Sequence, residues 1–249
     1  MNYNIEGCKP EDVRYTPEGV YIKEQFYPCE RPRTEFCKIL DLFTENTTMY
    51  RRGDSWIHGG TKWEERKVQL GPFCVIGGSG FGYERDPESG CLIRMKHFGN
   101  VIIEDGVQIH SGVTIDRAVL GSTIIGSGTM IDNRVHIAHA VKVGKNCLIV
   151  SGTTLGGSST IGEGCYIGMN VCVKNRIHIG KYCMVGMGAV VVKDVPDYAV
   201  ICGNPAKIIG WQNENGERLH FDESGLAKDS KGKYYQNKNG VVCAVSSAQ

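Results

Sequence analysis

The stretch "IGSGTM IDNRVH IAHAVK VGKNCL", residues 125–148, consists of blocks of six that each begin with Ile or Val. The same division continues to Pro196, with Ile, Leu or Val first and a small or β-branched residue fifth in every block. A helix buries one face every 3.6 residues and cannot produce this period, whereas a short strand followed by a tight turn can. Three such sides predict a triangular coil, with successive coils stacked at roughly the 4.8 Å spacing of parallel strands.

This phase places residues one coil apart above one another in the interior. The predicted first-position ladders include Ile131, Ile149, Ile167 and Val185, and a second set, Val143, Ile161 and Ile179. The predicted fifth-position ladder is Thr129, Cys147, Cys165 and Cys183. We interpret these cysteines as small interior residues, because free cysteine is among the most buried residue types.

The pattern also predicts how the chain is divided. Another coil covers 103–120, four extra residues then shift the frame, and an earlier rung begins at Leu70. Residues 78–100 break the repeat as a long loop, where binding residues tend to lie. We therefore expect a small α/β segment over 1–69, with a packing helix at 31–43, a coil over 70–210 and a short hairpin-like β appendage over 211–249.

Composition excludes several classes of protein. The 28 basic and 27 acidic residues give a net charge of +1, which offers no attraction for nucleic acid or an anionic membrane. No apolar run approaches the roughly 18 residues of a membrane span, and the first residues lack a signal-peptide pattern. The eleven cysteines form no Cys-x-x-Cys pair, which favours reduced thiols and a cytoplasmic protein.

Two segments resemble known acyltransferases. "TIDRAVLGSTIIGSGTMIDNRVHIAHAVKVGKN" (114–146) and "GGSGFGYERD" (77–86) resemble the hexapeptide-repeat UDP-3-O-acylglucosamine N-acyltransferases of lipid A synthesis. "VPDYAVICGNPAKII" (195–209) is similar to acetyl-CoA-dependent sugar acetyltransferases. The resemblance implies an all-β, left-handed parallel β-helix, a homotrimer with active sites between subunits, and a nucleotide-sugar substrate.

The same resemblance indicates which residues perform the chemistry. It implies that His139, in "IAHA", is a general base and that the Gly157 N–H stabilises an oxyanion. Their separation by one coil predicts, independently of the family, that they are neighbours. The alternative for His139 is an ordinary solvent-facing turn.

Further residues are candidates for the same site. Asp132 and Asn133 are expected to orient His139 or the substrate, or else to form a solvated turn. The expected substrate contacts are Phe81, Tyr83, His136 and Arg117. The alternatives are that the Phe81–Tyr83 pair anchors its own loop and that His136 is structural. Two positions depart from the family: Ala140 replaces an asparagine, and Arg176 replaces a second histidine.

The sequence suggests an acyl donor as well. Three glycines would leave one wall of the site without side chains, so that acetyl-CoA could lie against it: Gly168, Gly186 and Gly188. The motif at the end of the coil would add four more contacts: Asn204, Pro205, Ala206 and Lys207. We therefore expect acetyl transfer from acetyl-CoA to an amino group of a nucleotide-linked amino sugar. The alternatives are a 3-hydroxyacyl-acyl carrier protein donor, or a non-catalytic module. A zinc site is not expected, because His110, His136 and His139 have the wrong separations.

Overall fold

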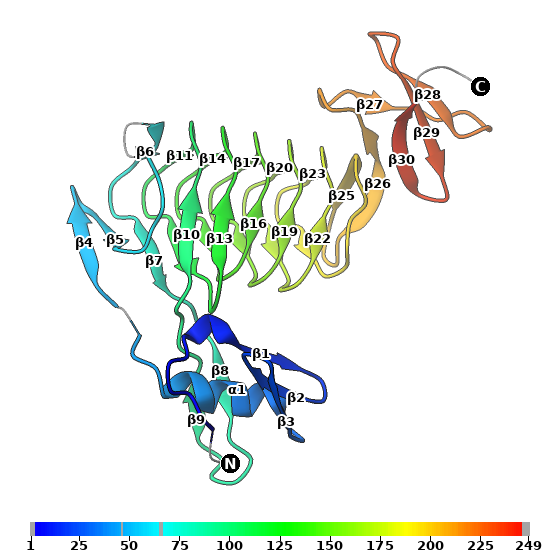
Figure 1. The fold of residues 1–249 in the computed structure, drawn as a ribbon. Helices are drawn as coiled ribbons and strands as arrows, with labels where there is room; N and C mark the ends of the chain where they lie inside the picture. Colours follow the sequence, from blue (N-terminus) through cyan, green and yellow to red (C-terminus); the bar gives the residue numbers. More distant parts are fainter. Residues whose placement is uncertain (1–2, 46, 65–66, 246–249) are drawn as a thin grey trace.

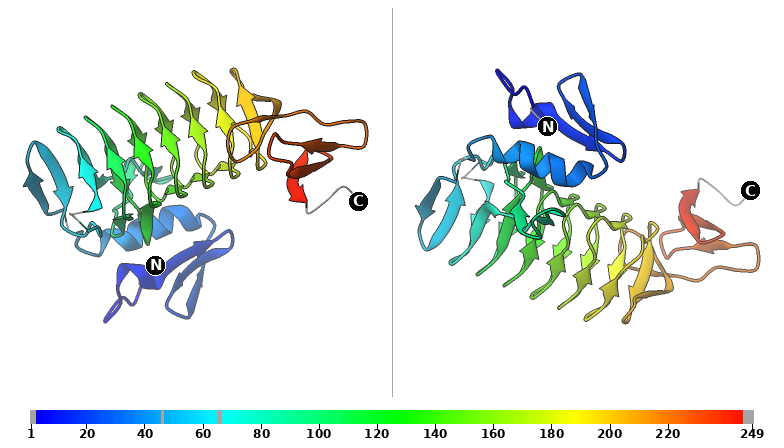
Figure 2. Two further views of the ribbon diagram at one scale, coloured as in Figure 1. Left: turned by 90° about the horizontal axis from the view of Figure 1, so that it is seen from above. Right: turned by 90° about the horizontal axis from the view of Figure 1, so that it is seen from below.

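In the computed structural model, residues 3–45, 47–64 and 67–245 are described, and the outermost residues of the first and last expected segments lie outside these ranges. The described chain forms a long coil of short parallel strands (Figure 1). A small module of helix and strands lies against one side of the coil, and a small sheet lies beyond its far end (Figure 2). The expected all-β, left-handed parallel β-helix is confirmed.

The coil has three sides, each a sheet. The first side contains, in spatial order, β27 (Arg218–Leu219), β26 (Lys207–Gln212), β25 (Ala199–Cys202), β23 (Met184–Val185), β20 (Tyr166–Ile167), β17 (Leu148–Ile149), β14 (Met130–Ile131), β11 (Gln108–Ile109) and β6 (Gln69–Leu70). The second contains β24 (Val190–Val191), β21 (Cys172–Val173), β18 (Thr154–Leu155), β15 (His136–Ile137), β12 (Thr114–Arg117), β7 (Val75–Ser79), β5 (Ser55–His58) and β4 (Met49–Arg52). The third contains β10 (Asn100–Ile103), β13 (Ser122–Ile125), β16 (Lys142–Val143), β19 (Thr160–Ile161) and β22 (His178–Ile179).

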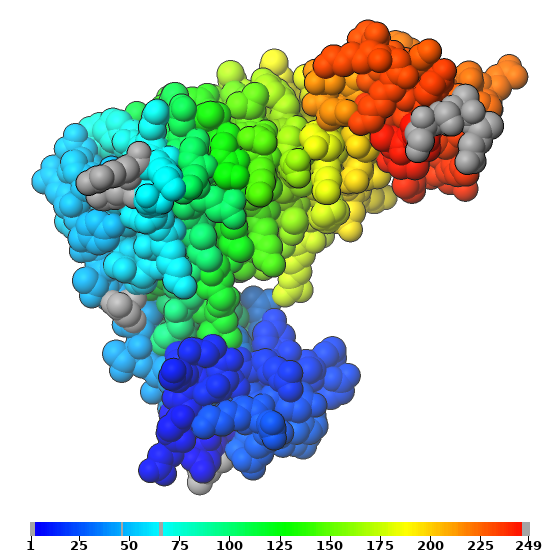
Figure 3. Space-filling model, turned by 45° about the horizontal axis from the view of Figure 1, so that its top comes forward, coloured from blue at the N-terminus to red at the C-terminus, as the bar shows by residue number. Residues whose placement is uncertain are grey.

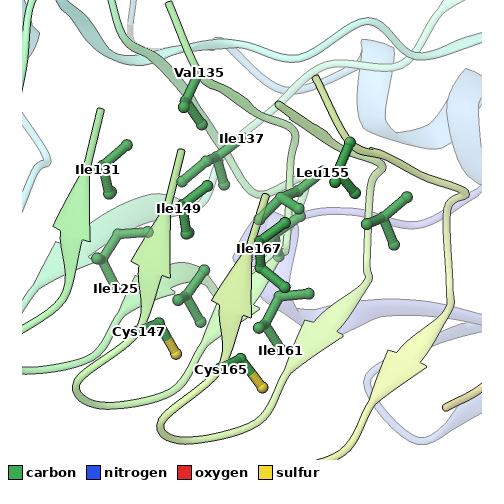
Figure 4. Close-up of a cluster of buried hydrophobic side chains, with 14 of the residues drawn as sticks. Ile125, Ile131, Val135, Ile137, Cys147, Ile149, Leu155, Ile161, Cys165 and Ile167 are labelled. Carbon is green, nitrogen blue, oxygen red and sulfur yellow. The ribbon is translucent and has the colours of Figure 1, made fainter. Parts of the chain in front are cut away.

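The strand register confirms the predicted ladders. Ile131 pairs with Ile149, and Ile149 with Ile167, each one coil apart. The first-position residues point inward and are almost wholly removed from solvent (Figure 4). Burying one such aliphatic side chain contributes about 1.5–3 kcal/mol, so the repeat itself supplies the core.

The fifth-position ladder closes the turns. Cys147, Cys165 and Cys183 are buried, and their thiols donate to backbone carbonyls of the neighbouring coil, at 3.1 Å for the Cys147 Sγ to Gly162 O pair. Thr129 Oγ1 makes the equivalent bond to Gly144 O at 2.9 Å. A small donor at this position satisfies a carbonyl that would otherwise be buried without a partner.

The four extra residues enlarge one coil and leave the strands in register. Ile103 pairs with Ile125 and Ile115 with Ile137, each 22 residues apart, whereas the later pairs are 18 apart. The surplus leaves the coil as a protruding loop over 118–121, between β12 and β13. This loop provides the surface on which the N-terminal module packs.

The N-terminal module comprises a short 3-10 helix, η1 (Pro10–Asp12), an antiparallel sheet of β1 (Val13–Thr16), β2 (Gly19–Ile22) and β3 (Gln25–Pro28), and α1 (Pro32–Asp41). The predicted apolar face of α1 is buried: Phe36, Ile39 and Leu40 pack with the β1–β2 strands. Phe98 of the inserted loop and Val119 and Leu120 of the protruding loop pack against this cluster. The module is thereby fixed to the protruding loop.

The coil begins earlier than the expected boundary at residue 70. β5 pairs in parallel with β7, with Ile57 beside Ile76, and β4 pairs with β5. Residues 49–58, which we had placed in the N-terminal segment, therefore extend a side of the coil. The buried residues of β5, Ser55, Ile57 and His58, span too few positions for the six-residue period to be visible.

The remaining segments are hairpins. Within the inserted loop 78–100, β8 (Tyr83–Arg85) pairs with β9 (Leu92–Arg94). After β27 the chain forms an antiparallel sheet of β28 (Leu226–Lys228), β29 (Tyr234–Lys238) and β30 (Val241–Val245) around buried Tyr235. Among the described residues, no helix has the length and hydrophobicity required to traverse a bilayer.

Candidate active site

His139 lies at the corner between β15 and β16, directly below Gly157 of the next coil. Ser158 N donates to His139 O at 2.9 Å, which joins the two corners. A Cβ built on Gly157 would stand 2.6 Å from His139 Nε2, so the imidazole lies against the bare glycine. The predicted neighbours are thus adjacent, with Nε2 as the near atom.

The Gly157 N–H donates to no described residue. The equivalent N–H groups of His139 and Asn175, one coil below and above, are likewise without a described acceptor. A free donor is therefore a general property of this corner. What distinguishes Gly157 is the imidazole beside it.

A cavity of about 250 Å³ opens beside His139, between the coil and the N-terminal module. Its walls are largely apolar and come from both parts of the chain: Tyr15, Arg33, Phe36, Met95, Val119, Leu120, His139, Ala140, Ser158 and Arg176. The space-filling view shows the N-terminal module standing beside the coil (Figure 3). Arg33 and Phe36 could not be linked to His139 from the sequence, since only the docking of α1 brings them together.

The surroundings of His139 favour its neutral form. Burial lowers the pKa of His139 from the usual histidine value, and the positive charges of Arg33 and Arg176 lower it further. Arg33 also forms a 2.9 Å ion pair with Glu84, whereas Arg176 makes no ion pair with any described residue. A neutral imidazole at neutral pH can accept a proton, as a general base must.

A second histidine, His97, was not predicted as part of the site. It is fully buried, and its ring centroid lies 5.5 Å from that of His139 in an edge-to-face arrangement. The sequence offers no signal for it, because residue 97 lies in the loop that breaks the repeat.

Arg117, which the sequence suggested as a substrate contact, lies buried and bonded to other parts of the chain. Its side chain is only 2% exposed and pairs with Glu45, itself 5% exposed, at 2.5 Å. Arg117 also donates to His97 O at 2.9 Å and to Gly77 O at 2.8 Å. These bonds occupy the guanidinium of Arg117 and hold the inserted loop and the segment after α1 against the coil.

His136 lies three residues before His139, at the end of the preceding hexad, and faces outward from β15. Its Nδ1 is 2.8 Å from Thr114 Oγ1, and its Nε2 is 3.8 Å from the Asp116 carboxylate. Burial raises the pKa of Asp116 to about 7, although Arg117 opposes the shift. His136 and Asp116 therefore form a second titratable pair close to the candidate base.

Asp132 and Asn133 are not brought to His139. They occupy the corner between β14 and β15, where Asp132 accepts bonds from the N–H groups of Asn133 and Ser151. Asn133 Oδ1 accepts from Ser111 N at 3.1 Å. These bonds hold the turn and leave neither side chain to orient the imidazole, so the alternative of an ordinary turn fits the structure.

The residues expected to contact acetyl-CoA have roles in the fold that require no ligand. A Cβ on Gly168 would collide with the Val185 carbonyl at 2.7 Å, and one on Gly186 with Cys202 at 2.9 Å, whereas Gly188 faces open space with a φ of +68°. The motif of Asn204, Pro205, Ala206 and Lys207 forms the turn from β25 to β26, with a cis Asn204–Pro205 bond. Ala206 N donates to Val190 O at 2.9 Å, which closes the end of the coil.

Phe81 and Tyr83, the aromatic pair of the inserted loop, lie where a substrate could contact them. Phe81 is 86% exposed, and its ring lies 5.0 Å from that of Tyr83. Within the described residues, no group of three or more histidine, cysteine or carboxylate side chains is arranged to hold a metal ion. His110 lines a different hollow, beside Leu70.

Comparison with known proteins agrees with this geometry. The family "Bacterial transferase hexapeptide (six repeats)" matches residues 122–157 and 158–193. UDP-3-O-acylglucosamine N-acyltransferase of Christiangramia forsetii is 52% identical over 147 residues, covering 59% of this chain and 42% of that protein. The protein of the same name from Methylorubrum populi is 36% identical over 167 residues, covering 67% of this chain and 47% of that protein.

A solved structure supports the fold alone. UDP-N-acetylglucosamine O-acyltransferase of Moraxella catarrhalis RH4 superposes with a TM-score of 0.50 at 24% identity, covering 66% of this chain and 75% of that one. The coil is therefore a hexapeptide-repeat β-helix, and its residues 122–193 match the bacterial transferase hexapeptide family. The resemblance to UDP-3-O-acylglucosamine N-acyltransferases is confirmed, although the chain spans less than half the length of these two relatives.

The expected acetyl transfer is wrong. The curated relatives are named UDP-3-O-acylglucosamine N-acyltransferases, and such enzymes take the acyl group from acyl carrier protein, not from acetyl-CoA. In the structure the "CGNPAK" segment forms the turn that closes the end of the coil, so its presence does not by itself identify the acyl donor. With acetyl-CoA excluded, the assignment of Gly168, Gly186, Gly188 and the end motif to its binding also falls.

Proposed function

We propose that the chain transfers an acyl group from the thioester of an acyl carrier protein to the amino group of a nucleotide-linked amino sugar of the UDP-3-O-acylglucosamine type. The relatives named above support this reading. The observation that carries it is the contact between His139 Nε2 and the bare face of Gly157, at the edge of a cavity. A base and an oxyanion donor next to each other are what acyl transfer requires.

The reaction then follows from this geometry. The acceptor amine attacks the thioester carbonyl carbon while His139 Nε2 removes the amine proton. Nε2 must be free of a proton at this stage, so the neutral ring carries its proton on Nδ1. The Gly157 N–H donates to the oxyanion of the tetrahedral intermediate. Collapse breaks the carbon–sulfur bond, and the thiolate leaves with the proton held by His139.

The charges around the cavity suit a phosphate-bearing acceptor. Arg33 approaches from α1 and Arg176 from the coil, and both line the same cavity as His139. Arginine binds phosphate oxygens through paired N–H groups, so the two side chains are suited to the diphosphate of a nucleotide sugar. The exposed Phe81–Tyr83 pair and the outward-facing His136 are further candidate contacts.

The same proposal includes a homotrimer. Leu148, Tyr166 and Met184 project from the first side of the coil and are 39–46% exposed. The equivalent outward positions on the third side are Lys142, Thr160 and His178. An apolar side beside a polar one indicates which side is buried between copies of the chain.

The test is an acyl-transfer assay with 3-hydroxyacyl-acyl carrier protein and UDP-3-O-acylglucosamine. The wild-type chain is expected to form the amide and release thiol, and His139→Ala to lose nearly all turnover. His178→Ala is the matched control, because His178 is an exposed histidine on another side of the coil. Full activity in His139→Ala would refute the assignment of the base.

A further inference from the structure

His97 is an unusual residue for the position it occupies. Its side chain is completely buried, and neither ring nitrogen makes a hydrogen bond to a described residue. The approach of the Met95 backbone falls short of hydrogen-bond geometry. Burying an unpaired imidazole costs free energy, so a leucine or phenylalanine would fill the same space with less cost.

The side chain is held against His139. The two rings meet edge to face, with centroids 5.5 Å apart and planes inclined by 68°. Gly80 of the inserted loop covers both rings: a Cβ there would stand 2.6 Å from His97 Nε2 and 3.1 Å from His139 Cβ. His139 is therefore enclosed by Gly157 on one side and by His97 and Gly80 on others.

The backbone of His97 is fixed as firmly as its ring. His97 N donates to Glu45 Oε1 at 3.3 Å, and His97 O accepts from Arg117 Nε at 2.9 Å. Both partners belong to the buried Arg117–Glu45 ion pair. A residue anchored at both backbone groups presents its ring to His139 in one orientation.

The charges that face the two rings keep them neutral. Burial, His139 and Arg117 lower the pKa of His97 to about 4, against the opposing charge of Glu45. His139 faces Arg33 from α1, Arg176 from the neighbouring coil and His136 from its own strand, all of which disfavour its charged form. Both imidazoles are therefore held in the neutral form at neutral pH.

We infer that His97 is a positioning residue, which holds the His139 ring by edge-to-face contact so that Nε2 stays against Gly157. This inference rests on the proposed function, in which His139 is the base. The ring contact, and not a hydrogen bond, holds the His139 ring, because the nitrogens of His97 bond to none of the described residues. A pair of this kind replaces the hydrogen-bonded carboxylate or carbonyl that commonly orients a catalytic histidine.

The test compares His97→Ala, which removes the ring, with His97→Phe, which keeps a ring and removes the nitrogens. The His139 ring signal is followed by NMR as a function of pH, and it is assigned by its loss in His139→Ala. In His97→Ala, water should enter the vacated space, so the midpoint of the His139 titration should rise toward the ordinary histidine value. The acid limb of the kcat profile should move with it, and kcat should fall on the order of 10- to 100-fold with little change in KM.

His97→Phe should retain the wild-type titration and most of kcat. An unchanged titration and kcat in His97→Ala would overturn the inference, as would a loss in His97→Phe equal to that in His97→Ala. If His97→Ala does not fold, Gly80→Ala takes its place, because its methyl group would displace both rings. Gly78→Ala is the control, since its methyl group would meet nothing closer than 3.6 Å.

The two proposals fail separately. Activity in His139→Ala would refute the proposed function, whatever the His97 variants do. An inactive His139→Ala together with a normal His97→Ala would refute the positioning role alone.

Discussion

Gly157 lies one coil beyond His139, and the methyl group of an alanine at 157 would stand 2.6 Å from His139 Nε2. Position 157 has no need of glycine for its backbone, since its φ is not among the positive values. The absence of a side chain is therefore a requirement of the imidazole beside it.

Gly157→Ala should accordingly reduce kcat on the order of 100-fold, because the methyl group would force the base out of position. Stability should change much less, since the nearest atoms belong to a half-buried side chain. Thermal unfolding and the acyl-transfer assay would separate the two effects. Gly59→Ala, whose methyl group would meet only Thr48 O at 3.8 Å, is the control that should leave both unchanged.

His97 should make the protein less stable as the pH falls. Its pKa is about 4 in the folded state and about 6.5 in an unfolded chain, so between these values only the unfolded chain binds the proton. Its contribution is lost as pH decreases from about 6.5 to about 4, by on the order of 3 kcal/mol. In His97→Phe, urea unfolding should show a free energy of unfolding that declines less over this window; an identical decline would contradict the assigned pKa.

Asp116 should act in the opposite direction. Its pKa is raised to about 7, so between about pH 4 and pH 7 the folded chain retains a proton that the unfolded chain has lost. Its contribution to stability is therefore lost as pH rises through this window. Asp116→Asn should be more stable than wild type at pH 7.5, on the order of 4 kcal/mol, and nearly equal to it at pH 4. Equal stability at both pH values would show that the carboxyl is not desolvated.

The contribution of the Arg117–Glu45 pair to the free energy of unfolding should be measurable when one partner is removed. Arg117→Met removes the buried cation beside Glu45 and leaves the carboxylate to the half-exposed Arg94, so it should cost on the order of 3 kcal/mol in the free energy of unfolding. Glu45→Gln combined with Arg117→Met should recover part of this loss, because the second change removes a buried charge that has lost its buried partner. Strict additivity of the two single changes would indicate that the groups do not interact.

A substitution at Tyr166, the exposed aromatic residue on the first side of the coil, tests the proposed trimer. Tyr166→Glu places a charge in the centre of that side and should shift the chain from trimer to monomer in light scattering. Thr160→Glu, at the outward position of the neighbouring side, is the control and should remain a trimer. A trimeric Tyr166→Glu would mean that the copies meet elsewhere.

The sequence predicted the coil from its own regularity. Ile149 and Cys147 recur in register with their neighbours because each block repeats one local structure, so periodicity alone fixed their burial. The contact of His139 with Gly157 followed from the same count of residues. These are relations between positions a constant distance apart in the chain.

The rest of the site could not be found in this way. Arg33, Glu45 and His97 reach the coil from segments with no period, and they meet only because α1 and the inserted loop dock there. Arg117 shows the opposite difficulty. Its place in a "TIDR" strand suggested a ligand contact, whereas its partner Glu45, distant in sequence, determines that it is buried.

The protruding loop at 118–121 has a consequence for how such a pocket arises. The strands before and after it still pair with those of the next coil, so the four surplus residues interrupt none of these strand pairings. Val119 and Leu120 nevertheless form part of the cavity wall and carry the N-terminal module. A change in the length of this protruding loop would alter the depth of the pocket while the other coils stayed intact. The loop is therefore the point at which evolution, or an engineer, can adapt the scaffold to a ligand of another size.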